Sequence, residues 1–335
     1  MEELGLTIRG MVQAGKGILA ADESLPTIAK RFSPFGIAST EETRRSYRSL
    51  LFSSTGIEEY ISGVILFEET LTQTDDEGRL LPELLSSKGI VSGVKVDRGT
   101  TALAGSPGDK ITEGLDGLAG RLETYKSQGA RFAKWREVYV IAEKNPSPLA
   151  IDANAEVLAR YAMICQEAGI VPIVEPEVLM DGDHSIERCF EVTEKVLHAV
   201  FHALERHGVV LECIVLKPSM VLPGKTFMPR ASAEEVAEAT VRVLRRTVPA
   251  SVPSINFLSG GQGPEEATSN LNAMNAKFPA QPWEISFSYG RALQKTALEA
   301  WEGKAENRDA MQKAFLKRAR LNGLARRGEY GPEME

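Results

Sequence analysis

The chain has 335 residues, of which 43% are hydrophobic and 25% charged, a composition typical of a globular protein large enough for one barrel-sized domain of about 250 residues with insertions. With 39 Lys and Arg against 46 Asp and Glu, the net charge of −7 argues against a general nucleic-acid binder, so any anion site must be a local cluster of basic residues. The sequence has no run of 18 apolar residues and no basic N-terminal segment leading into an apolar one, so we expect a cytoplasmic protein that does not enter a membrane.

Eight short runs rich in apolar and β-branched residues recur along the chain, and most are separated by a segment with a helical pattern. The runs are residues 17–21, 61–67, 91–96, 131–139, 170–174, 213–216, 254–258 and 284–287. The main helical segments are 40–51, 115–128, 153–167, 186–206, 233–246 and 264–276, and 289–323 is expected to form one or two more helices. This alternation predicts an α/β fold with a parallel sheet, and eight repeats suggest closure into a (β/α)8 TIM barrel.

No linker, low-complexity tract or shift in composition divides the chain. We therefore expect residues 1–335 to form a single barrel domain, with a helix before the first strand and helices after the last. Asp152 is the expected N-cap of the helix that starts at Ala153. The polar residues 326–335 are expected to form a loose tail.

Polar residues follow nearly every predicted strand. In chain order the strand ends read Asp22-Glu23-Ser24, Glu68-Glu69, Lys95-Val96-Asp97-Arg98, Lys134-Trp135-Arg136, Glu175-Pro176-Glu177, Lys217, Ser259-Gly260-Gly261-Gln262-Gly263 and Ser288-Tyr289-Gly290-Arg291. In a barrel of this kind the chemistry gathers at the carboxyl ends of the strands. We therefore expect lysines and carboxylates to converge on one pocket.

Lys217 is the most informative of these residues. It ends an apolar run and precedes Pro218, which cannot extend the strand. An ordinary strand-end lysine would reach solvent, whereas a lysine taken out of water can attack a carbonyl and form a Schiff base. Residues two apart on a strand share a face, so Lys134 with Arg136, and Lys95 from the neighbouring run, would bring three cations towards Lys217.

Two stretches have the pattern of anion sites. The glycine-rich turn 259–263 runs from a strand into a helix that begins at Pro264, so backbone amides and a helix N-terminus can hold a phosphate, and Gly290 and Arg291 can add another amide and a guanidinium. The loops after strands seven and eight are where barrels often bind phosphate. A second anion subsite, composed of Ser24, Thr27, Lys95 and Arg136, would suit a substrate phosphorylated at both ends.

The sequence gives little sign of a metal site. Cys165, Cys189 and Cys213 are too far apart for a paired motif, and they suggest neither a disulfide framework nor a cysteine zinc site. His198 and His202 would share a helix face, but no glutamate follows the first histidine as a metalloprotease motif requires. We expect no metal and no cofactor.

The strand ends together resemble the motifs of class I fructose-1,6-bisphosphate aldolases. The similar segments are 17–24, 93–97, 132–136, 174–177, 216–218, 257–262 and 287–293. They cover nearly the whole chain, in order. The resemblance implies a metal-independent (β/α)8 lyase that cleaves fructose 1,6-bisphosphate reversibly to dihydroxyacetone phosphate and glyceraldehyde 3-phosphate, and it implies a homotetramer.

The resemblance also implies roles for individual residues. Lys217 would form the Schiff base, Glu175 would act as general acid and base, and Asp22, Lys134 and Glu177 would complete the catalytic set. The site for one phosphate would comprise Ser259, Gly260, Gly261, Ser288, Gly290 and Arg291. The other end of the substrate would meet Ser24, Thr27, Arg31, Arg44, Lys95 and Arg136.

Elementary chemistry agrees with this interpretation, because cleavage of a carbon–carbon bond needs an electron sink and a protonated imine accepts electrons better than a ketone does. Two alternatives remain open. Another Schiff-base enzyme of sugar phosphates, such as a transaldolase or a deoxyribose-phosphate aldolase, would need only one phosphate subsite. A non-catalytic barrel scaffold is disfavoured by the catalytic set around Lys217.

Overall fold

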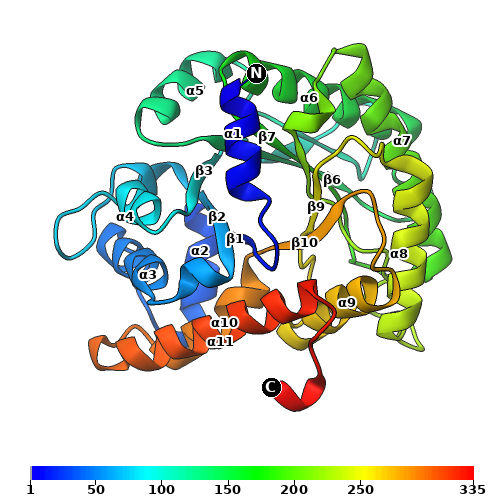
Figure 1. Cartoon of the computed structure of the whole chain (residues 1–335). Helices are drawn as coiled ribbons and strands as arrows, with labels where there is room; N and C mark the ends of the chain where they lie inside the picture. Colours follow the sequence, from blue (N-terminus) through cyan, green and yellow to red (C-terminus); the bar gives the residue numbers. More distant parts are fainter. Residues whose placement is uncertain (1) are drawn as a thin grey trace.

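A closed barrel of eight parallel strands forms the centre of the computed structural model, which describes residues 2–335 (Figure 1). Around the barrel the strand order is β1-β10-β9-β8-β7-β6-β3-β2. The strands are β1 Gly17–Ala21, β2 Ile61–Leu66, β3 Val91–Lys95, β6 Phe132–Tyr139, β7 Val171–Val178, β8 Val215–Leu216, β9 Ser254–Phe257 and β10 Glu284–Tyr289. The predicted (β/α)8 barrel is therefore confirmed.

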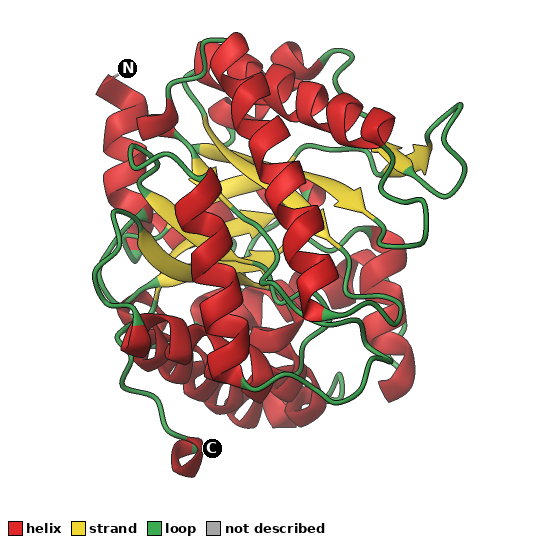
Figure 2. Cartoon of the chain, turned by 90° about the vertical axis from the view of Figure 1, so that its right-hand side faces the viewer, coloured by secondary structure: helices red, strands yellow, loops and turns green. Residues whose placement is uncertain are grey.

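Helices enclose this barrel, as Figure 2 shows for the red helices around the yellow strands. They are α1 Glu2–Met11, α2 Leu25–Phe32, α3 Glu41–Ser53, α4 Leu81–Ser87, α5 Leu118–Ser127, α6 Pro148–Glu167, α7 Ile186–Arg206, α8 Ala233–Thr247, α9 Pro264–Lys277, α10 Arg291–Trp301 and α11 Arg308–Arg326. Within residues 2–335, none of them combines the length and the apolar character needed to cross a membrane.

Helix α1 closes the end of the barrel at which the strands begin. Its buried side chains Leu4, Ile8 and Met11 form one cluster with inward-facing residues of the strands. The strand residues of this cluster are Ile18, Ala20, Ile65, Phe132, Val171, Ile173 and Val215. The opposite end, where the strands finish, is therefore the end at which polar side chains can line a cavity.

The barrel interior leaves room for the ring of Phe132 only because β3 carries a glycine beside it. A Cβ atom on Gly93 would lie 2.2 Å from Cε2 of Phe132, far inside van der Waals contact. Residue 93 must therefore be a glycine for this aromatic side chain to fill the barrel, in keeping with the close packing of protein interiors.

Several elements differ from the sequence prediction. Strand β7 continues to Val178, four residues beyond the expected end, whereas β8 is reduced to two residues because Leu211–Cys213 forms a 3-10 turn. Helix α6 begins at Pro148 and is capped by Ser147, whose side chain accepts a hydrogen bond from the Ala150 amide, so the N-cap expected at Asp152 is wrong. Helices α2 and α4 were not predicted.

A short antiparallel hairpin, β4 Thr100–Ala102 with β5 Lys110–Thr112, follows β3 outside the barrel and was also not predicted. A carboxylate on β6 anchors it: the Thr112 amide donates to Glu137 at 3.1 Å, and Nε1 of Trp135 donates to the same carboxylate at 2.8 Å. Glu137 is fully buried, and burial raises its pKa to about 8 in spite of these two hydrogen bonds.

The tail 326–335 is packed against the body of the protein rather than loose. Tyr330 is buried, and its amide donates to Oδ1 of Asn272 on α9 at 2.9 Å. Its hydroxyl donates to Glu335 at 2.9 Å, and Glu335 in turn pairs with the buried Arg318 of α11. The tail supplies the carboxylate that this guanidinium requires, a long-range pairing that local composition does not reveal.

Candidate active site

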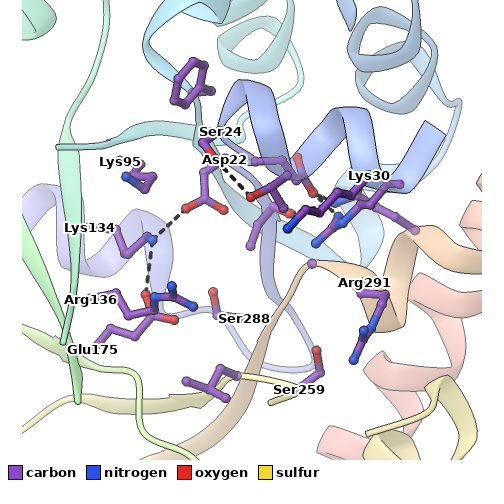
Figure 3. Close-up of a pocket in the computed structure, with 18 of the residues that line it drawn as sticks. Asp22, Ser24, Lys30, Lys95, Lys134, Arg136, Glu175, Ser259, Ser288 and Arg291 are labelled. Atoms are coloured by element: carbon purple, nitrogen blue, oxygen red, sulfur yellow. Dashed lines mark hydrogen bonds and ion pairs between the residues drawn. The ribbon is translucent and has the colours of Figure 1, made fainter. Parts of the chain in front are cut away.

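A cavity of about 1130 Å³ opens at the carboxyl ends of the barrel strands (Figure 3). It is lined by residues in the carboxyl-terminal part of the barrel strands or just beyond them, and all eight strands contribute. The members predicted from the sequence are Asp22, Ser24, Thr27, Arg31, Lys95, Lys134, Arg136, Glu175, Glu177, Lys217, Ser259, Gly260, Gly261, Ser288, Gly290 and Arg291. All predicted site residues except Arg44 therefore border one space.

Lys217 lies at the end of β8 with only 3% of its surface exposed. Its backbone amide donates to the Val174 carbonyl at 2.8 Å, which extends the pairing with β7 by one residue. Its Nζ lies 3.1 Å from Oε1 of Glu175, the next residue along β7. The amine is thus withdrawn from bulk water and held next to a carboxylate that can exchange a proton with it.

Lys134 is the centre of a buried ionic cluster. Its Nζ lies 2.7 Å from Oδ2 of Asp22, 3.3 Å from Oε2 of Glu175 and 3.8 Å from Oδ2 of Asp97 (Figure 3). Burial by itself would lower the pKa of Lys134, but the three carboxylates outweigh it and raise that pKa above its usual value. Lys134 is therefore a permanent cation at the site.

The same cluster keeps Asp22 ionised. Burial would raise the pKa of Asp22, but the ammonium groups of Lys134 and Lys217 hold it well below its usual value. Asp22 is therefore a hydrogen-bond acceptor at neutral pH.

Carboxylates separate the cations, an arrangement that the sequence analysis did not foresee. We expected three like charges to approach Lys217, and the register does pair Lys95 with Lys134 on neighbouring strands. However, Lys95 bonds to Asp97, with 2.6 Å between Nζ and Oδ1, and Arg136 bonds to Glu177, with 2.9 Å between Nη1 and Oε2. The surroundings of Lys217 are thus an alternating network rather than a cluster of one sign.

Glu177 lies two residues beyond Glu175 on β7, so both side chains point to the same face of the strand. Burial raises the pKa of Glu177 above its usual value, although Arg136 opposes this. The two carboxylates therefore have different cationic partners. Glu175 lies next to Lys134 and Lys217, whereas Glu177 pairs with the guanidinium of Arg136.

The glycine-rich turn lies on the side of the cavity opposite to Lys95, where Figure 3 shows Ser259 and Arg291. Gly260 and Gly261 have φ angles of 53° and 97°, a left-handed conformation that favours glycine. The turn leads into the N-terminus of α9, and Arg291 begins α10. Ser288 lies at the same level, and its buried hydroxyl has no partner among the described residues. The donors of this region suit an anion.

A second group of donors lies around the start of α2. The hydroxyls of Ser24 and Thr27 are 3.0 Å apart, and Arg31 pairs with Glu23 at the cavity wall. Lys30 also lines the cavity (Figure 3). Together with Lys95 and Arg136, these side chains provide further basic groups around the cavity, with Lys95 on the side away from Arg291 (Figure 3).

Arg44 does not belong to the cavity. Its Nε and Nη2 donate to the two carboxylate oxygens of Glu69 at 2.7 and 2.8 Å, and its Nη1 donates to the Ser39 carbonyl at 2.9 Å. All its donor nitrogens are thus engaged in a bidentate pair and a backbone contact. The structure therefore does not support the predicted place of Arg44 near the second phosphate.

The sequence analysis missed several lining residues, among them Lys30, Arg121 and Gln294, and it named Glu23 and Arg98 only as strand-end residues without a role. Lys30 lies on helix α2, directly after the strand end that carries Glu23, so α2, had it been predicted, would have pointed to it. Gln294 comes one turn after Arg291 on α10 and donates to Glu23 at 2.9 Å. Among residues 2–335 no group of three or more His, Cys, Asp or Glu side chains is arranged to hold a metal ion.

Comparison with known proteins gives concordant matches over nearly the full chain. The family model described as glycolytic, class-I fructose-bisphosphate aldolase matches residues 3–335. The chain is 56% identical over 321 residues to human fructose-bisphosphate aldolase C, which covers 96% of this chain and 88% of the relative. It is 55% identical over 316 residues to cytosolic fructose-bisphosphate aldolase 4 of Arabidopsis thaliana, covering 94% and 80%.

A solved structure agrees with these matches. The fructose-bisphosphate aldolase of Plasmodium falciparum, in a complex with TRAP and a small-molecule inhibitor, superposes with a TM-score of 0.97 at 51% identity. The superposition covers 98% of this chain and 95% of the other.

Proposed function

The chain belongs to the class I fructose-bisphosphate aldolase family, and we propose on this basis that its cavity cleaves fructose 1,6-bisphosphate reversibly to dihydroxyacetone phosphate and glyceraldehyde 3-phosphate, with Lys217 as the Schiff-base lysine. One observation carries the assignment of Lys217: its Nζ is buried at a strand end, 3.1 Å from Glu175, in the cavity that also holds the glycine-rich anion turn. A buried amine beside a proton acceptor is the arrangement that nucleophilic attack on a carbonyl requires.

The first steps build the imine. Lys217 gives a proton to Glu175 and attacks the ketone carbon of the substrate. The resulting carbinolamine loses its hydroxyl as water after Glu175 returns a proton to that oxygen. At 3.1 Å Glu175 is within hydrogen-bonding distance of Lys217, as a proton shuttle must be. The product is a protonated imine whose positive charge lies next to the bond that will break.

The cleavage step uses that charge. When the carbon–carbon bond breaks, its electron pair moves into the imine to give an enamine, and the hydroxyl proton of the fragment that leaves as the aldehyde passes to Glu175, which became a carboxylate again when it protonated the departing water. Asp22, which is ionised and 2.7 Å from Lys134, can accept a hydrogen bond from this hydroxyl. Lys134 remains charged and stabilises the anionic groups around it throughout.

The two basic regions would hold the two ends of the substrate. Ser259, Gly260, Gly261, Ser288, Gly290 and Arg291 would bind the phosphate nearer the imine, and Ser24, Thr27, Arg31, Lys95 and Arg136 would bind the other. The placement of Lys95 on the side of the cavity away from Ser259 and Arg291 supports this division, because a substrate fixed at both ends places its reacting carbon in one position only.

Trapping the imine tests the proposal. Borohydride added with fructose 1,6-bisphosphate in the presence of a chelator should leave a reduced adduct on Lys217, detected by peptide mass spectrometry, and the Lys217→Met variant should carry none. An adduct on another lysine would overturn the assignment of Lys217, and the absence of both adduct and cleavage would overturn the proposed function.

We also propose a single folding domain, a cytoplasmic location and a homotetramer. The single barrel supports the single domain, and the cytosolic relative supports the cytoplasmic location. Membership of the family supports the homotetramer. Sedimentation should give four times the chain mass of 36.5 kDa. Cell fractionation should recover the protein in the soluble cytoplasmic fraction. Heating should give one unfolding transition, because one barrel forms one core.

A further inference from the structure

A pair of buried amide side chains lies behind the glycine-rich turn and has no place in the mechanism above. Gln262 is 2% exposed and Asn270, on the first half of α9, is 4% exposed. Nε2 of Gln262 donates to the Ser259 carbonyl at 3.0 Å, and Nδ2 of Asn270 donates to Oε1 of Gln262 at 2.7 Å. The two amides thus form a chain of hydrogen bonds that ends on the turn.

The hydrogen bonds between these two amides and the turn can run in only one direction. The Ser259 carbonyl can only accept, so it requires the NH2 group of Gln262, and the amide oxygen of Gln262 must then face Asn270. Asn270 has to present its own NH2 group in return. Asn270 therefore determines the orientation of the Gln262 side-chain amide, and that amide helps to fix the direction of the Ser259 carbonyl.

The direction of that carbonyl matters because a trans peptide group is planar, with its C=O and N–H pointing in opposite directions. The Ser259 carbonyl accepts from both the backbone amide and the side chain of the buried Gln262, at 2.9 and 3.0 Å. The Gly260 N–H is on the other edge of the same peptide, and Gly260 itself lines the cavity. This N–H donates to no acceptor within residues 2–335.

Packing beside the turn is incomplete. A small void lies behind Gly260, lined by Met180, Cys189 and Gln262 among others. Gly260 and Gly261 have no side chains that could wedge the turn in place. The side-chain hydrogen bonds of Gln262 thus add a restraint, beyond the backbone bond of its amide, on the peptide that joins Ser259 to Gly260.

We propose that Gln262, oriented by Asn270, is a positioning residue that aims the Gly260 N–H at the substrate phosphate. The inference rests on the proposed function, since it assumes that the turn binds the phosphate nearer the imine. Neither side chain touches substrate. Their effect is to keep the donor in place before the phosphate arrives, which removes the cost of ordering it on binding.

Two variants test this. Gln262→Met keeps the length of the side chain and removes both of its side-chain hydrogen bonds, while the backbone bond from the amide of residue 262 to the Ser259 carbonyl remains. Asn270→Asp keeps the shape, but an ionised carboxylate only accepts, so it would take the NH2 group of Gln262 and turn the oxygen of Gln262 towards the Ser259 carbonyl. Each should raise the half-saturating concentration of dihydroxyacetone phosphate in borohydride trapping by about 5- to 30-fold, the effect of about one misdirected charge-assisted hydrogen bond.

Unphosphorylated dihydroxyacetone separates positioning from general damage. It should trap on Lys217 with the same half-saturation, within about twofold, in the wild type and in both variants, because it makes no phosphate contact. Asn154→Leu is the matched control. It removes an equally buried amide, which donates to the Lys110 carbonyl at 3.0 Å on the side of β5, and should shift neither ketose.

The inference is overturned if neither variant shifts the phosphorylated ketose, if both ketoses shift equally, or if Asn154→Leu reproduces the phosphate-specific shift. Titration calorimetry with inorganic phosphate examines the turn without the imine. A wild-type protein that traps neither ketose would refute the proposed function. Even then, weaker binding of inorganic phosphate by Gln262→Met would support the positioning role of Gln262, and unchanged binding would contradict it.

Discussion

Replacing Lys134 by methionine should destabilise the protein strongly, because the side chain neutralises three carboxylates at once. Its Nζ is 2.7 Å from Asp22, 3.3 Å from Glu175 and 3.8 Å from Asp97, and all four side chains are at most 14% exposed. Methionine fills a similar volume without the charge. The variant therefore leaves buried carboxylates without their main cation rather than creating a void.

Removing one partner of a buried ion pair typically costs about 3–5 kcal/mol, and we expect a loss of this size in the free energy of unfolding at pH 7. The matched control is Lys126→Met, which removes a surface pair with Glu3 of 2.8 Å in which the side chains are 31% and 49% exposed. An exposed pair contributes about 0.2–1 kcal/mol. The two variants should thus differ severalfold in their effect.

Urea unfolding followed by tryptophan fluorescence measures both losses, since Trp135 is buried next to Lys134 in the chain. The pH dependence gives a second check. The lowered pKa of Asp22 contributes stability that is present above its unfolded value of about 3.9 and is lost as the pH falls through the folded value, so the deficit of Lys134→Met should shrink below about pH 4. A deficit no larger than that of Lys126→Met at pH 7 would refute this account of the cluster.

Three further predictions concern single side chains. Arg291→Ala should raise KM for the bisphosphate by about 10- to 100-fold in steady-state assays, because a charge-assisted contact with phosphate is lost, and an unchanged KM would remove this residue from the site. Arg44→Ala should leave KM within about twofold, since its donors are held by Glu69 outside the cavity, and a rise like that of Arg291→Ala would contradict this placement. The pKa of Glu137 is raised to about 8, so the folded state retains a proton that the unfolded state loses above about pH 4.3. Glu137→Gln should therefore gain stability relative to the wild type as the pH rises from about 4.3 to 8, and a constant difference over that range in urea unfolding would show that Glu137 does not titrate in this way.

The barrel could be predicted because its strands are short, fully buried runs separated by helices. For β1 the predicted bounds coincide with the observed Gly17–Ala21. Closure then brings the strand ends together, which is how Asp22, Lys134 and Glu175, each more than 40 residues from the next, come within hydrogen-bonding distance. The catalytic roles assigned to these residues remain predictions.

The predicted end of β7 came too early because the sheet tolerates a proline that usually ends a strand. Pro176 lacks an N–H, and a proline usually argues against a central strand. Strand β8 pairs with β7 only up to Val174, so beyond that point one side of β7 needs no ladder hydrogen bonds. Pro176 is tolerated there, and the strand continues alongside β6 to Val178.

The choice of partner among charged side chains could not be predicted from the sequence. Arg44 and Lys95 look alike as candidates for binding a phosphate, but Glu69, 25 residues away, takes both edges of the Arg44 guanidinium. Similarly, the pairing of Gln262 with Asn270 depends on how the turn meets α9. Such contacts depend on the packing of whole elements and not on local pattern.

The closure of one barrel end by α1 has a practical consequence for attaching the protein to a solid support. Leu4, Ile8 and Met11 fill the end at which the strands begin, and the cavity opens at the other. A linker joined to the first turn of α1 would hold every molecule with its open end turned away from the support. An immobilised layer made this way should keep its substrate access, whereas attachment through surface lysines near the cavity, such as Lys295, would obstruct it.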